Sequence, residues 1–244
     1  MRNVMMVCEY DGTAYHGWQR QPNGISIQEV LEEKLGLITR EEIRLTASGR
    51  TDAGVHALNQ VANFRTKSTI GCENLLKGIN SLLPEDIAVK IMSDVDDAFH
   101  ARYSAKSKVY VYRIFNNRVR SALYRNYSWH LRTPLDVDVM NRAAKLLEGE
   151  HDFSSFCASG GDAEDHTRTV IGSSVHTRGN FISFTIEANG FLRYMVRNIT
   201  GLLADVGKRK IVPDEFKKIM CAKDRSRAGI TAPPQGLFLK EVRY

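Results

Sequence analysis

Apolar and polar positions along the chain follow two different periods, which predicts a mixture of helices and strands. In several segments apolar residues recur every three to four positions, as on the buried face of an amphipathic helix. Ser26, followed by Glu29 three positions later, forms a capping box at the start of the first segment. The predicted helices are residues 26–38, 73–83, 136–148 and 192–207, with a short one after Pro213.

Shorter runs rich in β-branched and aromatic residues predict strands. These runs are residues 3–10, 43–47, 58–66, 87–92, 108–115, 170–177, 181–188 and 236–244. The sequence RGN separates 170–177 from 181–188 and indicates a hairpin. In the strand 108–115, alternation places Tyr110 and Tyr112 on one face and Arg113 on the other.

The order of these segments predicts an α+β fold. Strands and helices do not alternate regularly, and several neighbouring strands suit antiparallel pairing, so we expect antiparallel or mixed sheets covered by helices. A chain of 244 residues can form one large domain or two small ones. Each half holds strands and two helices. We therefore expect two lobes, residues 1–105 and 106–244, with a cleft between them.

Composition points to a soluble protein outside the membrane. Hydrophobic residues are 43% and charged residues 25%, which is ordinary for a globular chain. The apolar run 4–8 is too short for a signal peptide or a membrane span. We therefore expect a cytoplasmic protein without membrane association.

The cysteines show no CxxC or zinc-ligand spacing and are expected to be reduced and buried. They are Cys8, Cys72, Cys157 and Cys221.

The distribution of charge suggests a polyanionic partner. The net charge of +6 and pI of about 9.1 are weak indications alone. Between Arg102 and Arg132, however, there are eight basic residues, no acidic ones and seven interleaved aromatics. Basic side chains bind phosphates and aromatic faces stack on unpaired bases, so this stretch predicts contact with nucleic acid. A basic strand whose aromatics simply fill the core is the alternative.

The segment GRTDAGVHA, residues 49–57, allows three interpretations of Asp52. Aspartate and glycine are common in tight turns. A metal site is disfavoured because Asp52 and His56 lack a third ligand nearby. Arg50 and Thr51 are not needed by a turn and favour a catalytic loop beside a nucleic-acid substrate. His56, like His16, is expected to be structural.

GRTDAGVHA resembles the catalytic motif of the TruA family of tRNA pseudouridine synthases. Other stretches resemble that family in the same order, so the likeness spans nearly the whole chain. They are YDGTAYHGWQRQP at 10–22, FHARYSAKSKVYVYRI at 99–114, GFLRYMVRNITG at 190–201 and the final GLFLKEVRY.

The resemblance implies an isomerase that converts uridine to pseudouridine at positions 38, 39 and 40 of the tRNA anticodon stem-loop. It implies no cofactor, no metal and a homodimer of two-lobed α+β subunits with the pseudouridine synthase fold. Asp52 matches the family's essential aspartate, and Arg197 matches the basic residue that pairs with it. Tyr110 matches the tyrosine that packs on the target base, and Arg50 the arginine that helps to extrude the nucleotide.

The chemistry of the reaction agrees with these assignments. Moving a base from a nitrogen to a carbon linkage requires an ionised carboxylate at the sugar–base junction, as nucleophile or base. A neighbouring guanidinium would lower the pKa of that carboxylate and orient it. A base within a stem must first be flipped out. Attack of Asp52 on C1′, addition to the base and elimination all stay open.

Two other functions are the alternatives. A noncatalytic RNA-binding protein is disfavoured by the presence of Asp52 and Arg197. A metal-dependent nuclease is disfavoured by the lack of a carboxylate cluster.

Overall fold

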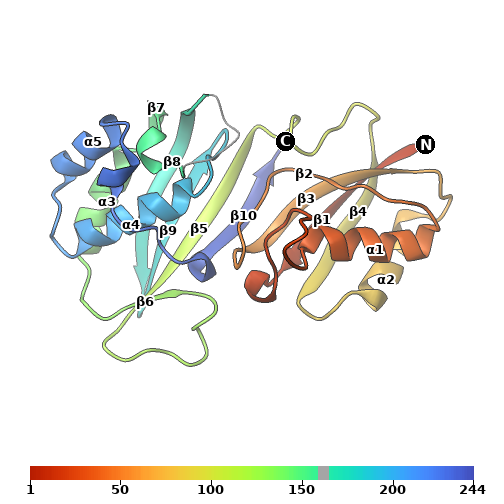
Figure 1. Cartoon of the computed structure of the whole chain (residues 1–244), viewed down its shortest axis with the longest axis horizontal. Helices are drawn as coiled ribbons and strands as arrows, with labels where there is room; N and C mark the ends of the chain where they lie inside the picture. The colour runs from red at the N-terminus through yellow and green to blue at the C-terminus, as the bar shows by residue number, and fades with distance from the viewer. Residues whose placement is uncertain (159–164) are drawn as a thin grey trace. The chain divides into compact units, whose positions relative to one another are not determined.

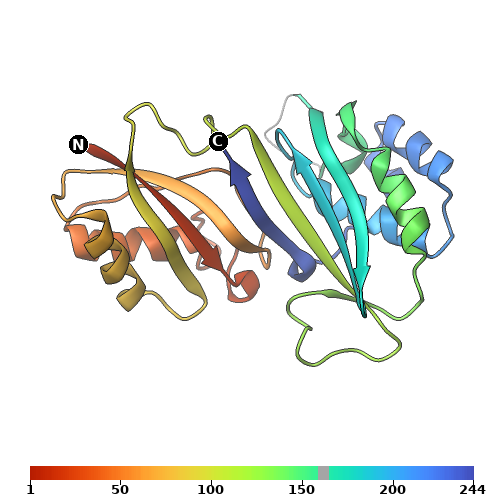
Figure 2. The ribbon, with the colours of Figure 1, turned by 180° about the vertical axis from the view of Figure 1, so that it is seen from behind.

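The computed structural model describes residues 1–158 and 165–244, and the chain forms two compact units (Figures 1 and 2). The first unit is Met1–Lys106 with Phe238–Tyr244, and the second is Ser107–Leu237. Each combines a sheet with helices, which confirms the predicted α+β class. Compared with the expected lobes 1–105 and 106–244, the boundary lies one residue later, after Lys106, and the final residues Phe238–Tyr244 cluster with the first unit.

The first unit is built on a sheet with β1 inside it. Its strands are β1 (Arg2–Tyr10), β2 (Thr46–Ala47), β3 (His56–Thr66), β4 (Ile87–Val95) and β10 (Leu237–Arg243). β1 pairs antiparallel with both β3 and β4, and β2 pairs antiparallel with β3. β10 arrives from the far end of the sequence and pairs with β3 in parallel, with Phe238 opposite His56. In Figure 1 the blue arrow of β10 lies beside the orange β3.

Two helices, α1 (Ile27–Thr39) and α2 (Cys72–Leu82), complete the first unit (Figure 1). Both lie within one residue of their predicted bounds. The Ser26 hydroxyl accepts a hydrogen bond from the Glu29 amide at 3.3 Å, which confirms the predicted cap. Ile27, Leu31 and Leu35 are fully buried, as the apolar period required.

The second unit contains an antiparallel sheet in the order β5, β9, β8, β7. Its strands are β5 (Ser107–Asn116), β6 (Trp129–Leu131), β7 (Gly149–Asp152), β8 (Thr167–Arg178) and β9 (Phe181–Ala188). Figure 2 shows β5, β9 and β8 side by side. β8 and β9 form the predicted hairpin. The short strands β6 and β7 were not predicted; β6 pairs in parallel with the end of β5.

Helices α3 (Val137–Lys145), α4 (Met195–Gly207) and α5 (Pro213–Cys221) cover this sheet (Figure 1). α3 packs on β8 and α4 on β5, while α3 also contacts α4 and α5. Short 3₁₀ helices complete the described structure: η1 (Gly12–Ala14), η2 (Ser154–Phe156), η3 (Arg225–Ala228) and η4 (Pro234–Gly236).

The predicted helix 192–207 is wrong in its first turn. α4 begins at Met195, because Tyr194 has a φ of 63° and a ψ of 4°, in the left-handed region that a helix cannot use. Arg193 therefore lies outside the helix, whereas Arg197 lies within it, so the two are not neighbours on one helix face. The two guanidinium groups instead lie over the same ring, that of Tyr194, at 5.1 and 4.7 Å from its centroid.

The cysteine thiols are all free. Cys8 and Cys157 are buried as expected, whereas Cys72 is half-buried and Cys221 is exposed, so burial of all four was wrong. Burial raises the pKa of the Cys8 thiol to about 12, although the charge of Lys90 opposes the rise.

None of the helices in the described part of the chain has the length and apolarity needed to cross a membrane.

Candidate active site

The loop that carries Asp52 joins β2 to β3 and contains a tight turn. The Val55 amide donates to the Asp52 carbonyl at 3.1 Å, and Gly54 has a φ of 75°. The turn interpretation of this motif is therefore correct for the backbone. It does not account for the Asp52 side chain, which is half-buried at the start of the turn beside the exposed Ala53.

The loop that follows β1 holds the Asp52 loop in place. The Trp18 amide donates to the Thr51 carbonyl at 3.1 Å, and the Gly54 amide donates to the Tyr15 carbonyl at 3.3 Å. The Tyr10 and Thr51 hydroxyl groups share a hydrogen bond of 2.7 Å. These bonds lie on both sides of Asp52. Two motifs that are well separated in the sequence are thus joined by hydrogen bonds next to Asp52, and a carboxylate on backbone fixed in this way suits electrostatic catalysis.

Gly17 allows these two loops to approach. Its φ is 88°, and a Cβ placed there would lie 2.5 Å from the Thr51 carbonyl oxygen. Only a residue without a side chain fits without moving backbone. Nothing in the local sequence indicates that Gly17 holds the Asp52 loop in place.

Gly17→Ala should therefore destabilise the fold and weaken activity together. We expect the forced backbone shift to lower the free energy of unfolding by about 1–3 kcal/mol, in addition to the cost of the left-handed conformation for alanine. Gly179→Ala is the matched control, because Gly179 also has a positive φ, 59°, but nothing lies within 4 Å of its added Cβ. Thermal unfolding and turnover would be compared. Equal effects of the two substitutions would contradict the close approach.

His56 is a structural residue, as expected. The residue is 1% exposed, and its Nδ1 accepts a hydrogen bond from the Gly12 amide at 3.1 Å. Its ring stacks on Phe238 of β10, with centroids 4.7 Å apart. His56 thus ties the end of the Asp52 loop to the final strand.

Arg50 lies just before Thr51, on backbone fixed by buried polar contacts. The Ser48 hydroxyl donates to the Gln60 side chain at 2.7 Å, and the Gln60 amide donates to the Gly49 carbonyl at 2.8 Å. The Arg50 side chain itself is exposed. A guanidinium presented from fixed backbone suits contact with a substrate phosphate or base.

Tyr110 lies in β5 of the second unit and is 7% exposed. Its ring meets Phe191 edge-on, with centroids 4.9 Å apart and planes at 76°. Tyr112, two residues along the same strand, is fully buried and donates its hydroxyl to the Pro233 carbonyl at 2.7 Å. The two tyrosines of this predicted face thus have different surroundings, and Tyr112 belongs to the core.

Arg197 lies in the first turns of α4 and is half-buried. Its Nε donates to the Ala232 carbonyl at 2.8 Å, and the Ala232 amide donates to the Arg197 carbonyl at 3.1 Å. Sequence reasoning missed this partner. Prolines at 233 and 234 indicate extended backbone before them, but nothing in the sequence indicates that it returns to α4.

The four predicted site residues are divided between the units. Asp52 and Arg50 belong to the first, and Tyr110 and Arg197 to the second. Their roles, including the pairing of Arg197 with Asp52, stay predictions. Within residues 1–158 and 165–244, no three His, Cys, Asp or Glu side chains are grouped as ligands for a metal ion.

The basic and aromatic stretch 102–132 divides into a strand and a loop. Its β5 aromatics are largely core, as the alternative interpretation held. Residues 117–128, here called the basic loop, leave β5 and return to β6. The loop exposes three arginines and four large apolar or aromatic side chains, which are Val119 at 72%, Leu123 at 79%, Tyr124 at 45% and Tyr127 at 38%. The arginines are Arg118, Arg120 and Arg125. The basic loop is the part of this stretch suited to contact a polyanion.

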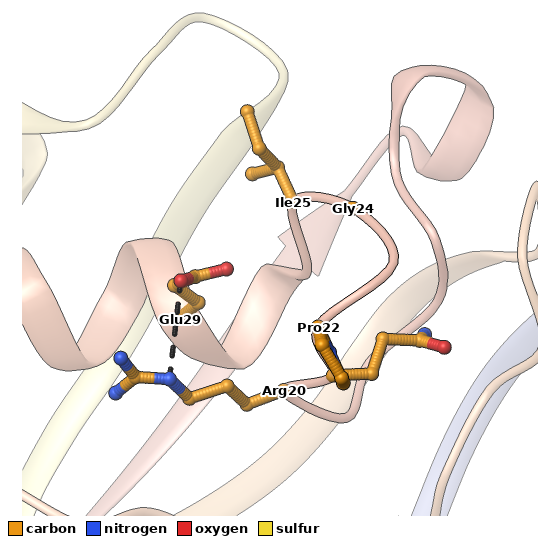
Figure 3. A pocket seen from close by; sticks show the side chains of 6 residues that line it. Arg20, Pro22, Gly24, Ile25 and Glu29 are labelled. Atoms are coloured by element: carbon orange, nitrogen blue, oxygen red, sulfur yellow. Dashed lines mark ion pairs between the residues drawn. The ribbon is translucent and has the colours of Figure 1, made fainter.

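An open pocket of about 540 Å³ lies where the N-terminal motif meets α1 (Figure 3). In it, Arg20 Nε lies 3.8 Å from a Glu29 carboxylate oxygen; a terminal nitrogen of Arg20 also lies 3.9 Å from a carboxylate oxygen of Glu32, which does not line the pocket. The pocket is lined by Arg20, Gln21, Pro22, Gly24, Ile25 and Glu29. None of the four predicted site residues lines it, so its size does not make it the centre of the chemistry.

Comparison with known proteins identifies the family. A sequence profile described as tRNA pseudouridine synthase matches residues 6–104 and 143–244. The tRNA pseudouridine synthase A of Thermoanaerobacter pseudethanolicus is 52% identical over 244 residues, covering 100% of both chains. That of Caldicellulosiruptor bescii is 46% identical, and the tRNA pseudouridine synthase A 2 of Clostridium perfringens 44%, each also covering 100% of both chains. The chain belongs to the tRNA pseudouridine synthase family.

Proposed function

We propose that this protein isomerises uridine to pseudouridine at positions 38, 39 and 40 of the tRNA anticodon stem-loop, with Asp52 as the catalytic carboxylate. The observation that carries the proposal is the bracing of Asp52 on both sides by hydrogen bonds from the N-terminal motif, in a chain of this family. A carboxylate on so fixed a backbone suits chemistry that depends on placement.

The reaction is an exchange of bonds within one nucleotide. The bond from N1 to C1′ breaks, the base turns, and a bond from C5 to C1′ forms. The proton on C5 leaves and N1 gains one, so substrate and product are isomers and no electrons enter or leave. Asp52 would supply the ionised oxygen at the sugar–base junction, as nucleophile or base.

The other predicted residues would prepare and hold the base. Arg50, exposed next to the Asp52 loop, would support a nucleotide flipped out of the stem. Tyr110, its ring set by Phe191, would pack on the flipped uracil. Arg197 would orient Asp52 and keep it ionised.

The test is incubation of the pure protein with tRNA transcripts, followed by chemical mapping of pseudouridine. We expect product at uridines 38–40 and none where uridine is replaced by cytidine. Binding without product would favour the noncatalytic RNA-binding alternative. Strand cleavage that stops on chelation of divalent metal would favour the nuclease.

Affinity for tRNA should fall steeply with salt, because each phosphate contact releases counterions. Each contact contributes about 0.7 to 0.9 to the slope of log affinity against log salt. Changing Arg118, Arg120 and Arg125 to Gln should therefore reduce the slope by about 2 to 3. Filter binding at several KCl concentrations would measure it.

The control for this prediction removes the same charge elsewhere. Lys210, Lys217 and Lys218 are exposed at or near α5, and their change to Gln also removes three positive charges. If both triple variants give the same slope, the basic loop is not a specific contact.

We also propose a cytoplasmic homodimer, chiefly from the family resemblance. The basic loop exposes apolar as well as basic side chains, and a tRNA is long compared with one subunit of 27.5 kDa. One subunit could hold the arm while the other modifies it. Light scattering should give twice the subunit mass. An active monomer at assay concentration would refute the dimer.

A further inference from the structure

Arg197 is held from two directions within the second unit. Its guanidinium carbon lies 4.7 Å from the ring centroid of Tyr194. Its Nε donates to the Ala232 carbonyl at 2.8 Å. A cation over an aromatic face is attracted by the ring, and a carbonyl acceptor fixes the rotation of the guanidinium plane. Together these contacts favour one orientation of a long side chain that otherwise has many rotamers.

Tyr194 keeps its ring there in an unfavourable backbone conformation. With a φ of 63°, it occupies the left-handed region, which costs a side-chain-bearing residue free energy that glycine does not incur. Its carbonyl accepts from the Asn198 amide at 2.9 Å, so this backbone also starts α4. Glycine would adopt this backbone conformation at a lower free-energy cost. It has no aromatic ring, however, so it could not make the contact with Arg197.

The Ala232 carbonyl is anchored by a buried polar network. Asn198, which is 0% exposed, accepts hydrogen bonds from Arg225 at 3.0 Å and from the Thr231 hydroxyl at 2.7 Å. The segment also packs directly on α4, since a Cβ on Gly201 would lie 1.9 Å from the Ile230 carbonyl oxygen. Ala232 thus has little freedom to move away from Arg197.

The charge of Arg197 acts within the protein interior. Burial raises the pKa of the Tyr112 hydroxyl, and the positive charge of Arg197 opposes that rise. A fixed charge next to low-dielectric surroundings interacts more strongly than one in water. Its orientation therefore matters for any anion that it faces.

We infer that Tyr194 is a positioning residue that holds the Arg197 guanidinium against the Ala232 carbonyl for the reaction. The inference rests on the proposed role of Arg197 in orienting the catalytic carboxylate. Without the ring, Arg197 keeps its charge but loses its fixed direction. Turnover falls, while tRNA binding, which depends on contacts elsewhere, is retained.

The test compares Tyr194→Phe, Tyr194→Leu and Tyr194→Gly in the full protein. Phe keeps the ring face and should keep kcat within about twofold. Leu should lower kcat by about 10- to 100-fold with KM unchanged, the expected effect of a misplaced catalytic group. Gly should do the same although it relieves the backbone, which separates loss of the ring from strain. Circular dichroism and thermal unfolding confirm folding.

The dependence of kcat on pH distinguishes a positioning role of Tyr194 from a purely structural one, because loss of a structural contact alone would not shift this profile. A well-placed guanidinium lowers the pKa of a neighbouring carboxylate, and the reaction needs the ionised form. With Leu at position 194, the acidic limb of the kcat profile should therefore shift to higher pH. With Phe it should stay in place.

The Arg197→Ala background separates this inference from the proposed function. There, Tyr194→Leu should have no further effect on kcat. A wild-type kcat for Tyr194→Leu, with Arg197→Ala impaired, would overturn the inference alone. Equal losses from Tyr194→Leu in both backgrounds would overturn it too. A wild-type kcat for Arg197→Ala would instead remove the proposed role of Arg197, and the inference with it.

Discussion

Asp52→Asn should reduce pseudouridine formation by on the order of 10⁴-fold or more, as loss of a central catalytic group does in other enzymes. Asparagine has nearly the same shape, but it carries no negative charge and no carboxylate nucleophile. Affinity for tRNA should change little, because binding depends on many phosphate and stacking contacts. Single-turnover assays with mapped tRNA and filter binding would measure the two quantities separately.

The turn interpretation makes the opposite prediction for Asp52. Asparagine favours turns as aspartate does, so the substitution would be nearly silent if the turn were the whole role. Asp96→Asn is a suitable control, because Asp96 is exposed in a loop of the same unit and caps the Ala98 amide at 2.7 Å. Near-normal turnover by folded Asp52→Asn would end the assignment.

Arg197→Ala should lower turnover by about 10²- to 10³-fold, the loss typical of removing one preorganised electrostatic group. If Arg197 acts through Asp52, its loss should cost little more once Asp52 is already Asn. The double variant should then resemble Asp52→Asn alone, as for residues that work as a unit. Single-turnover rates for the four members of the cycle test this.

Arg193→Ala is the matched control for Arg197. It removes an arginine four residues earlier whose guanidinium lies over the same Tyr194 ring, at 5.1 Å, but whose side chain is exposed. We expect a much smaller effect on turnover. Fully additive losses for Asp52→Asn and Arg197→Ala would show that the two residues act independently.

The long helices and strands could be predicted because the apolar period and the capping residues that specify each of them lie within its own segment. The Ser26 cap and the apolar period of α1 are both contained in the segment itself. The start of α4 was missed because Leu192 continues the apolar stripe and is buried, although it lies outside the helix. The break at Tyr194 accompanies a distant contact, from the Ala158 amide to the Arg193 carbonyl at 3.1 Å. β6, with three residues, is too short for any period.

The candidate site shows the same division. The motif around Asp52 was visible because it is one continuous stretch. The hydrogen bond from Trp18 to the Thr51 carbonyl and the acceptor that Ala232 offers to Arg197 join segments more than 30 residues apart. Hydrophobic period and turn chemistry contain no information on such pairings. The supporting groups of a site are therefore harder to find in a single sequence than its central residue.

The parallel strand β10 has a consequence for folding during synthesis. Domains generally fold as units as they leave the ribosome, the N-terminal one first. Here the first unit includes Phe238–Tyr244, so its sheet cannot be completed until nearly the whole chain has been translated. Until then the edge of β3 and the ring of His56 lack the partner that Phe238 provides. Ribosome-bound chains that stop before residue 238 should therefore lack the β10 pairing at His56 and Ala57, and the end of the Asp52 loop should gain its contact with Phe238 only when synthesis is almost complete.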